Sequence, residues 1–312
     1  MKSTPLRIAP WIPLLIGMLA ISFAPILVRY SNAPVSVQGM YRMLFTFLLM
    51  LPFGKSSLGQ IRNISRRDWL LLTAAGFFLA LHFLLWMASL SYTTIASSTI
   101  ILALEPVFVM IGAYFFLKDR LHRYAVIGMG IAVCGVVIVG SGDGSLSRTA
   151  LYGDVLSLLG TLAIVVNMLI AKRLLTRVPS YLFSLLTFGM TAAFFTLYNL
   201  VVGVRMTAYP PREWMIFLLL AIIPTVFGHL IFNWLLQYVK ATTISMSVLA
   251  EPIGSSILGM ILFGEMLAGF QYTGGALVII GLVLYMRAEQ GQALLPSTPN
   301  TQESSPISAI GK

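Results

Sequence analysis

The sequence predicts an all-α membrane protein with ten transmembrane helices, arranged as two inverted repeats of five helices. Three observations support this fold class. Charged residues make up only 10% of the 312 residues, and 58% are apolar, whereas soluble domains carry about 25% charge. Apolar runs of membrane-spanning length recur along the chain, and features of the first half return in the second. With a mean hydropathy of +0.91, the chain is suited to a bilayer.

A membrane-spanning helix needs about 20 mostly apolar residues. Ten segments meet this requirement, namely residues 11–29, 35–53, 69–89, 94–117, 123–140, 151–172, 180–203, 213–236, 241–263 and 268–286. We therefore expect a short N-terminus (1–10), a first repeat (11–140) and a second repeat (141–287). Residues 288–312 are rich in Ser, Pro, Gln and Thr, and this composition predicts a disordered tail.

The first apolar segment has an alternative interpretation as a signal peptide. Lys2 and Arg7 precede it, and Ser22-Phe23-Ala24 resembles a cleavage site between small residues. The apolar run continues past that site to Val28, and the internal repeat requires the segment. We therefore interpret it as the first transmembrane helix.

Lysines and arginines predict the orientation in the membrane. Fifteen of the twenty lie in the termini and even-numbered connections, four lie in odd-numbered connections, and Arg42 lies within a segment. Both termini are therefore predicted to be cytoplasmic. The net charge of +10 reflects this topology rather than binding to nucleic acid. The basic segment from Lys55 to Arg67 is either a contact with anionic membrane lipid or a plain cytoplasmic loop.

The two halves match at nearly constant offsets. A shift of 146 residues places Glu105-Pro106 on Glu251-Pro252, and a shift of 143 places Gly17 on Gly160. The first shift also aligns Leu90 with Leu236, Tyr92 with Tyr238, Leu121 with Leu267, Gly128 with Gly274 and Gly135 with Gly281. Because five helices is an odd number, the second repeat enters the membrane from the opposite side. Such inverted repeats are typical of secondary transporters.

Two long motifs carry a family resemblance. LEPVFVMIGAYFFLKDRL in the first half and AEPIGSSILGMILFGEML in the second are each followed by a glycine-spaced helix, and Arg42 follows Pro34 in the second segment. Over residues 11 to about 287, the chain resembles the EamA-like family of the drug/metabolite transporter superfamily. The second half has Gly264-Glu265 where the first has Lys118-Asp119, so the glycine is absent from the first half.

This resemblance implies a ten-helix carrier in a bacterial-type cytoplasmic (inner) membrane, often an exporter of amino acids, other metabolites or drugs. It also implies that helices 1–4 and 6–9 surround a central cavity, braced by helices 5 and 10. The expected partners are therefore a small-molecule solute and membrane lipid, without nucleic acid.

Two glutamates lie deep within apolar segments. At 1.5 Å per residue, Glu105 lies about 17 Å into its segment and Glu251 about 15 Å, close to the middle of a core of about 30 Å. Each acid costs about 2.5 kcal/mol or more to insert, and each precedes a proline that can kink the helix. We expect both acids to line an interior site, with a structural acid bonded between helices as the alternative.

Arg42 is the natural counter-charge for these acids. Gln38, Arg42 and Thr46 are spaced by four and form one polar stripe on the second helix, although an arginine there can also snorkel to the outer surface. Because Arg42 lies in the same half as Glu105, we expect these two to orient the solute. Glu251 has no cation in the equivalent helix and is predicted to be the proton-coupling or gating acid.

Further polar and aromatic side chains predict the lining of the cavity. His82 and Trp86 form an i, i+4 pair on the third helix, and His229, Asn233 and Gln237 follow the same spacing on the eighth. Asn167 on the sixth helix is a further candidate. For the histidines and amides the alternative is a hydrogen bond between helices, and for Trp86 it is packing.

The remaining motifs indicate no catalysis. The glycines of residues 123–140 and 268–286 give narrow helix faces, which close packing or a homodimer explains. The three histidines lie apart without carboxylates at ligand spacing, and no phosphate-binding glycine loop with lysine occurs. We therefore expect no metal, no cofactor and no enzyme activity. Two other functions compete with transport, namely a membrane-embedded enzyme acting on lipids and a receptor or scaffold that binds without flux.

Overall fold

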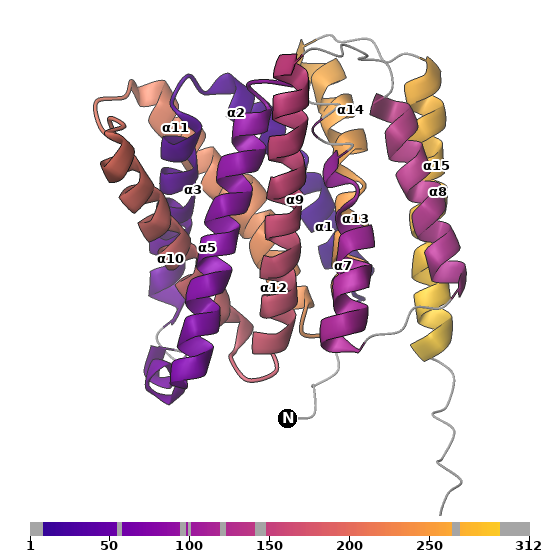
Figure 1. Ribbon diagram of the computed structural model, residues 1–312, viewed down its shortest axis with the longest axis horizontal. Coiled ribbons are helices and arrows are strands. Elements are labelled where there is room, and N and C mark those ends of the chain that lie inside the picture. Colours follow the sequence, from indigo (N-terminus) through magenta and orange to yellow (C-terminus); the bar gives the residue numbers. More distant parts are fainter. Residues whose placement is uncertain are drawn as a thin grey trace, which may run out of the picture.

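The computed structural model describes residues 9–54, 58–93, 98, 101–118, 123–140, 148–263 and 269–293. This part of the chain is almost entirely helical and contains no strand (Figure 1). Six of its helices are long and apolar enough to cross a membrane: Trp11–Tyr30, Val35–Gly54, Arg66–Ser89, Arg148–Leu174, Ser180–Val202 and Pro211–Leu235. Shorter apolar helices span Glu105–Leu117, Arg123–Ile138 and Tyr272–Ala288. The protein is therefore a multi-pass, all-helical membrane protein.

The first half contains α1 (Trp11–Ile21), α2 (Ala24–Tyr30), α3 (Val35–Met50), η1 (Leu51–Gly54), η2 (Gly59–Asn63), α5 (Arg66–Ser89), α7 (Glu105–Gly112), η3 (Ala113–Leu117) and α8 (Arg123–Gly140). Local sequence explains several boundaries. Pro34 directly precedes α3, and Ser65 caps α5 by accepting a hydrogen bond from the backbone N–H of Asp68 at 3.1 Å.

The second half contains α9 (Arg148–Leu174), α10 (Ser180–Val202), α11 (Pro211–Leu220), η4 (Ala221–Leu230), α12 (Ile231–Leu235), α13 (Ala241–Val248), α14 (Glu251–Phe263) and α15 (Gly269–Ala293). One continuous α-helix was expected over residues 213–236. Instead, η4 is a π-helical stretch of 10 residues that includes Pro224, because a proline within a helix removes one backbone donor and displaces the preceding turn.

The two segments that carry the deep glutamates are interrupted directly before each acid. A turn at Ala103 and Leu104 precedes α7, and a turn at Leu249 and Ala250 precedes α14. Each glutamate is thus the first residue of a new helix, with proline second. Proline suits that position because its missing N–H would have no partner in the helix, and an acid there faces the positive end of the helix dipole.

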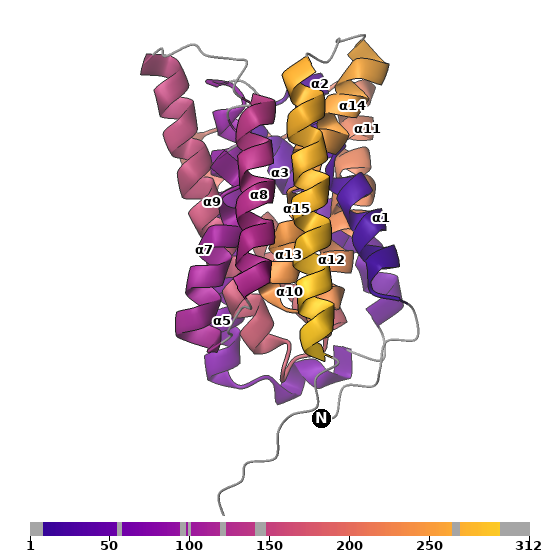
Figure 2. The ribbon, with the colours of Figure 1, turned by 90° about the vertical axis from the view of Figure 1, so that its right-hand side faces the viewer.

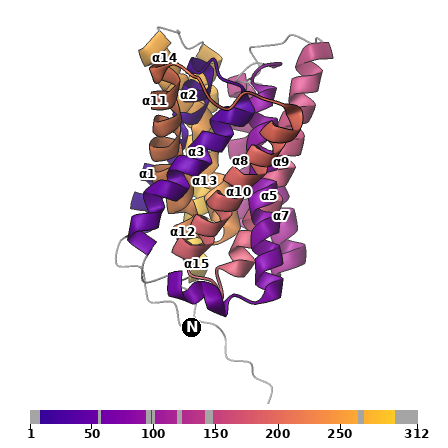
Figure 3. The ribbon, with the colours of Figure 1, turned by 90° about the vertical axis from the view of Figure 1, so that its left-hand side faces the viewer.

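The helices pack in pairs that join the two halves of the chain. α5 lies against α9, α10 against α3, and α1 against η4, while α10 also contacts α5. Figure 3 shows α3 and α10 on one side of the bundle, and Figure 2 shows α8 and α15 side by side on the opposite side. The halves are therefore intertwined and do not form two separate bodies.

Glycines allow the backbones of α8 and α15 to approach closely. A Cβ atom at Gly128 would lie 2.7 Å from the backbone nitrogen of Tyr285 and 2.8 Å from the carbonyl oxygen of Gly281. Gly135 faces the backbone of Gly274 and Val278 in the same way. Close packing between these two helices therefore accounts for several of the glycines whose alternative role was a homodimer contact.

The last helix, α15, continues through Ala293, beyond the apolar segment that was expected to end at residue 286. Arg287, Ala288, Glu289 and Gln290 all have good helix propensity, which favours this extension. The remaining residues of the expected tail lie outside the part of the chain that the structure describes. α1 begins and α15 ends at the lower end of the bundle in Figure 2.

Gly128 and Gly130 provide a matched test of this packing, since no atom lies within 4 Å of a Cβ at Gly130. We expect Gly128→Ala to reduce the free energy of unfolding by about 1–3 kcal/mol, the usual effect of overpacking. Gly130→Ala should be neutral or slightly stabilising because alanine favours the helix. Thermal unfolding of the purified variants in detergent measures both. Equal melting temperatures would contradict the described contact.

Candidate functional site

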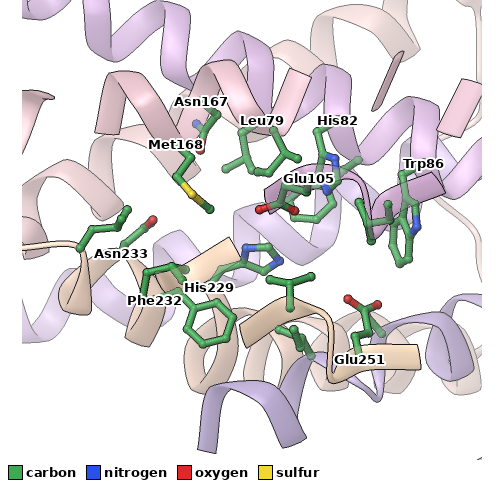
Figure 4. A pocket seen from close by; sticks show the side chains of 18 of the residues that line it. Leu79, His82, Trp86, Glu105, Asn167, Met168, His229, Phe232, Asn233 and Glu251 are labelled. Carbon is green, nitrogen blue, oxygen red and sulfur yellow. The ribbon is translucent and has the colours of Figure 1, made fainter. Parts of the chain in front are cut away.

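One internal pocket brings together eight of the nine site residues that the sequence predicts. Its lining includes Arg42, His82, Trp86, Glu105, Asn167, His229, Asn233 and Glu251. Figure 4 shows the two glutamates and His229 directed towards the same space. Among the described residues, none of α8 or α15 lines the pocket. Both halves of the chain therefore contribute to one site.

The pocket is contracted in this structure. Its volume is about 60 Å³, whereas one water molecule needs about 10–15 Å³ of such space. It can therefore hold a few waters, but a metabolite would require the surrounding helices to move apart. Apolar side chains complete the lining, including Leu79, Phe83, Phe188 and Phe232.

Arg42 is the fixed cation of the pocket. Its side chain is 0% exposed, so the snorkelling alternative is wrong for this arginine. Its Nε donates a hydrogen bond to Thr225 Oγ1 at 2.7 Å, and its guanidinium carbon lies 4.2 Å from the centre of the Phe83 ring. The Nη1 and Nη2 atoms have no hydrogen-bond partner. One edge of the guanidinium is thus anchored, and the two terminal nitrogens remain available.

The π-helical stretch η4 positions the acceptor for Arg42. Thr225 follows Pro224, and its hydroxyl donates to the carbonyl oxygen of Leu220 at 2.8 Å. That bond fixes the hydroxyl so that its lone pairs are free to accept from Arg42. Thr46, one turn further along α3, donates to the Arg42 carbonyl oxygen at 2.7 Å. The arginine is therefore supported from both α3 and η4.

The two deep glutamates line the same pocket as Arg42. No ion pair of 4 Å or less joins either of these described carboxylates to the guanidinium. The expectation that Arg42 accompanies Glu105 stays a prediction. Glu251 does not lack a nearby cation, because Arg42 of the other half lies in the same pocket. Glu105 is 2% exposed, and its Oε1 has no hydrogen-bond partner.

His82 and Trp86 form one stacked wall of the pocket. Their rings are nearly parallel, with an interplanar angle of 9° and centroids 6.2 Å apart. His82 Nδ1 lies 2.9 Å from the carbonyl oxygen of Gly160. Because a carbonyl only accepts, this contact places the proton on Nδ1 and leaves Nε2 as an acceptor in the neutral ring. The buried Nε1 of Trp86 has no hydrogen-bond partner.

The two asparagine side chains that line the pocket also form hydrogen bonds between helices. Asn167 Nδ2 donates to the carbonyl oxygen of Ala75 at 2.8 Å, and Asn233 Nδ2 donates to Ser184 Oγ at 3.2 Å. Each amide thus holds two helices together while it remains on the pocket wall. The ring of His229 meets Phe83 edge-on, with centroids 5.2 Å apart.

Gln38 is the predicted site residue that does not line the pocket. It is buried one turn before Arg42, and its Nε2 donates to the carbonyl oxygen of Ala33 at 2.8 Å. It therefore supports the start of α3. Gln237, which continues the spacing of His229 and Asn233, donates to the Trp234 carbonyl oxygen and also lies outside the lining.

Sequence reasoning did not identify two residues that hold Arg42. The signal for Thr225 was available, because Pro224 interrupts an apolar segment and such interruptions often accompany sites in transporters. Phe83 offered no comparable signal, since a phenylalanine in an apolar helix is ordinary. Its contact with Arg42 depends on the packing of α5 against α3.

The fold and the site define a class, namely multi-pass membrane proteins with a charged pocket enclosed by helices. The model of the EamA-like transporter family matches residues 10–141 and again residues 151–287. The chain therefore belongs to the EamA-like transporter family, and it is a membrane transporter of a small solute.

Named relatives agree with this assignment. An uncharacterized transporter of Archaeoglobus fulgidus is 24% identical over 79% of this chain and 84% of its own length. The uncharacterized transporter YxxF of Bacillus subtilis is 24% identical over 73% of each chain. A solved structure titled only "Crystal structure of protein" matches with a TM-score of 0.75 at 16% identity, over 91% of this chain and 98% of the other. That likeness shows the fold.

The anchor of Arg42 can be tested by replacing its acceptor. Thr225→Val preserves the shape of the side chain but leaves the buried Nε without a partner, which should destabilise the protein by about 1–3 kcal/mol. Thr225→Ser retains the hydroxyl and should remain close to the parent. Unfolding midpoints of the purified proteins measure the difference. If valine and serine give the same midpoint, the hydrogen bond does not hold Arg42.

Proposed function

We propose that the protein is a secondary transporter that exports a small organic solute, such as a metabolite, amino acid or drug, by alternating access. The observation that carries this proposal is a charged pocket that both halves of the chain enclose. Ionisable side chains are costly to bury in a membrane. A binding site for a solute explains why the pocket contains Arg42, Glu105 and Glu251. The outward direction of transport is part of the proposal, and it rests on the family resemblance.

The proposal includes ten transmembrane helices in two inverted repeats. The same family model matches the chain twice, over residues 10–141 and 151–287. The packing partners also exchange between the halves, since α5 of the first half contacts α9, the first helix of the second half. In turn, η4 within the eighth expected helix contacts α1, the first helix of the chain. Both facts support a twofold relation between the halves.

Two equivalent acidic residues, Asp68 and Glu213, support the same relation through the contacts that they form. Arg67-Asp68-Trp69 begins the third helix and Arg212-Glu213-Trp214 begins the eighth. Asp68 accepts from Arg177, in the connection between α9 and α10, at 3.2 Å. Glu213 accepts from Ser31 at 2.5 Å and from the Asn32 N–H at 3.0 Å, in the connection between α2 and α3. Equivalent acids thus hold equivalent connections at opposite ends of the bundle.

We further propose a bacterial-type cytoplasmic membrane, with both termini facing the cytoplasm. The distribution of lysines and arginines supports this orientation. The residues from Lys55 to Arg67 and from Lys172 to Arg177 then face the cytoplasm, where they can also contact anionic lipid. The connections at residues 30–34 and 203–210 face outwards.

Each charged group has a role in the proposed cycle. Arg42 presents two donors to the anionic part of a solute, while Glu105 and the histidine, tryptophan and asparagine side chains contact its remainder. Glu251 is the proton-coupling or gating acid, because its carboxylate competes with the solute for Arg42. When Glu251 takes up a proton, its attraction to Arg42 is lost and the guanidinium becomes available.

A growth screen tests transport directly. Cells that overproduce the protein are challenged with toxic metabolites, amino-acid analogues and drugs, and export of each protective solute is then measured in vesicles. Trp86→Ala should change which solutes confer resistance, since Trp86 forms a wall of the pocket. Phe77→Ala is the matched control, because Phe77 lies on the same helix but is 44% exposed on its outer face. Binding without flux, or an unchanged profile for Trp86→Ala, would contradict the proposal.

Replacing each acid separates their roles. Glu251→Gln should flatten the pH dependence of transport, because glutamine cannot exchange a proton. Glu105→Gln should retain that dependence and weaken the apparent affinity for the solute. Initial rates in proteoliposomes, measured across pH with and without a proton gradient, distinguish the two. If Glu251→Gln transports with the pH profile of the parent protein, the coupling role is incorrect.

A further inference from the structure

The two halves of the chain differ in two pairs of equivalent contacts, and this difference matters if the proposed transport function is correct. The hydrogen bonds accepted by Asp68 and Glu213 are both formed in this structure, one at each end of the bundle. They therefore do not distinguish one end from the other. A contact that only one half of the chain forms does so. Two such contacts occur among the residues that the structure describes.

The first involves Lys172, in the last turn of α9. Its ammonium group donates to the carbonyl oxygens of Leu236 and Val239, each at 2.6 Å. Leu236 directly follows α12, and Val239 lies two residues before α13, so Lys172 provides donors for two backbone acceptors in the connection between these helices. Leu236 also lines the pocket. Lys172 therefore ties α9 to the end of the eighth expected helix, beside the pocket.

The equivalent contact at the other end is not formed. The shift of 143 residues that aligns Gly17 with Gly160 also aligns Arg29 with Lys172, and the shift of 146 aligns Leu90 with Leu236. Arg29 lies in the last turn of α2, as Lys172 lies in the last turn of α9. Its side chain is exposed, and no hydrogen bond or ion pair joins it to any described residue.

The second contact shows the same asymmetry. His82 bonds the carbonyl oxygen of Gly160 at 2.9 Å, which joins α5 to α9. Under the shift of 146 the residue equivalent to His82 is Gly228, on η4, which packs against α1. Glycine has no side chain that could donate a hydrogen bond to the carbonyl oxygen of Gly17. Both contacts are thus formed by α9, the first helix of the second half, and have no counterpart at α1 or α2.

We propose that Lys172 and Arg29 are alternating gate residues of the transport cycle. Lys172 closes the cytoplasmic end of the pocket by capping the carbonyls at Leu236 and Val239. When the pocket opens towards the cytoplasm, Lys172 releases these two carbonyls. Arg29 then caps the corresponding carbonyls around Leu90, at the end of α5. Inverted repeats allow this exchange, because each half takes up the arrangement that the other half has left.

The chemistry of the two residues suits a reversible contact. A charged donor makes stronger hydrogen bonds than a neutral one, so one side chain can hold a helix end. A long basic side chain near the membrane surface can also regain water when it is released, which lowers the barrier to opening. Lys172 is only partly buried, unlike Arg42, whose charge stays enclosed. The structure then corresponds to a carrier closed towards the cytoplasm.

Accessibility of a cysteine in the pocket tests the exchange without knowledge of the solute. The parent for this test carries Cys134→Ser and Val248→Cys, since Val248 lines the pocket and is partly buried. A membrane-impermeant maleimide is applied to right-side-out and inside-out vesicles, and the ratio of labelling rates reports which side is open. Lys172→Met should raise labelling from the cytoplasmic side about tenfold, the effect of losing a hydrogen bond from a charged group. Arg29→Met should lower it.

Two control variants accompany this pair. Lys172→Arg retains a charged donor and should keep the ratio near that of the parent. Arg173→Met removes an exposed neighbouring cation whose side chain makes no hydrogen bond to the described residues, and it should leave the ratio unchanged. The proposal is overturned if Lys172→Met leaves the ratio within twofold of the parent, or if Lys172→Met and Arg29→Met shift it in the same direction.

The test separates failure of the gate from failure of the transport function. If the parent reacts from both sides and neither methionine variant changes the ratio, alternating access stands and the gate residues are wrong. If the parent and every variant react from one side only, and no solute is exported in the growth screen, the transport cycle itself is wrong. If the methionine variants shift the ratio in opposite directions, both are supported.

Discussion

The structure depends on how it accommodates one positive charge, that of Arg42, in the middle of a membrane protein. An unpaired charge in such a place costs several kcal/mol, and Arg42 is 0% exposed. Thr225 accepts from one nitrogen, the Phe83 ring covers one face, and Glu251 lines the same pocket. These residues come from η4, α5 and α14, so elements of both halves of the chain enclose the guanidinium. The two nitrogens left without partners are the strongest reason to regard the pocket as a binding site.

The broken helices serve the same constraint. An uninterrupted α-helix presents only side chains to its surroundings, whereas a helix that starts within the membrane also presents N–H groups and a partial positive charge. Both glutamates stand at such starts, directly before a proline. The π-helical stretch around Pro224 brings Thr225 to the pocket from the eighth expected helix. Non-helical or strained backbone is tolerated at this depth where it lines a cavity, which agrees with the location of these interruptions.

Much of the site could be predicted because polar side chains are rare in apolar helices. Arg42, His82, Glu105, Asn167 and Glu251 stand out for that reason, and all line the pocket. The contact between Arg42 and Thr225 could not be predicted, since it depends on the packing of η4 of the second half against α3 of the first. Gln38 satisfied the same spacing rule as Arg42 and yet bonds a backbone carbonyl. Helical spacing shows which residues share a face, but the neighbour of that face depends on tertiary packing.

The central claim is that Arg42 and Glu251 compensate each other within the pocket. The most direct test is a double-mutant cycle on the free energy of unfolding, with Arg42→Met, Glu251→Gln and the double variant. Each single change leaves or alters a buried charge, so the account predicts that both destabilise and that the double variant loses less than their sum. The predicted coupling energy is about 0.5–3 kcal/mol, the range for residues that are coupled through a shared cavity. Additive effects, with a coupling energy near zero, would contradict the account.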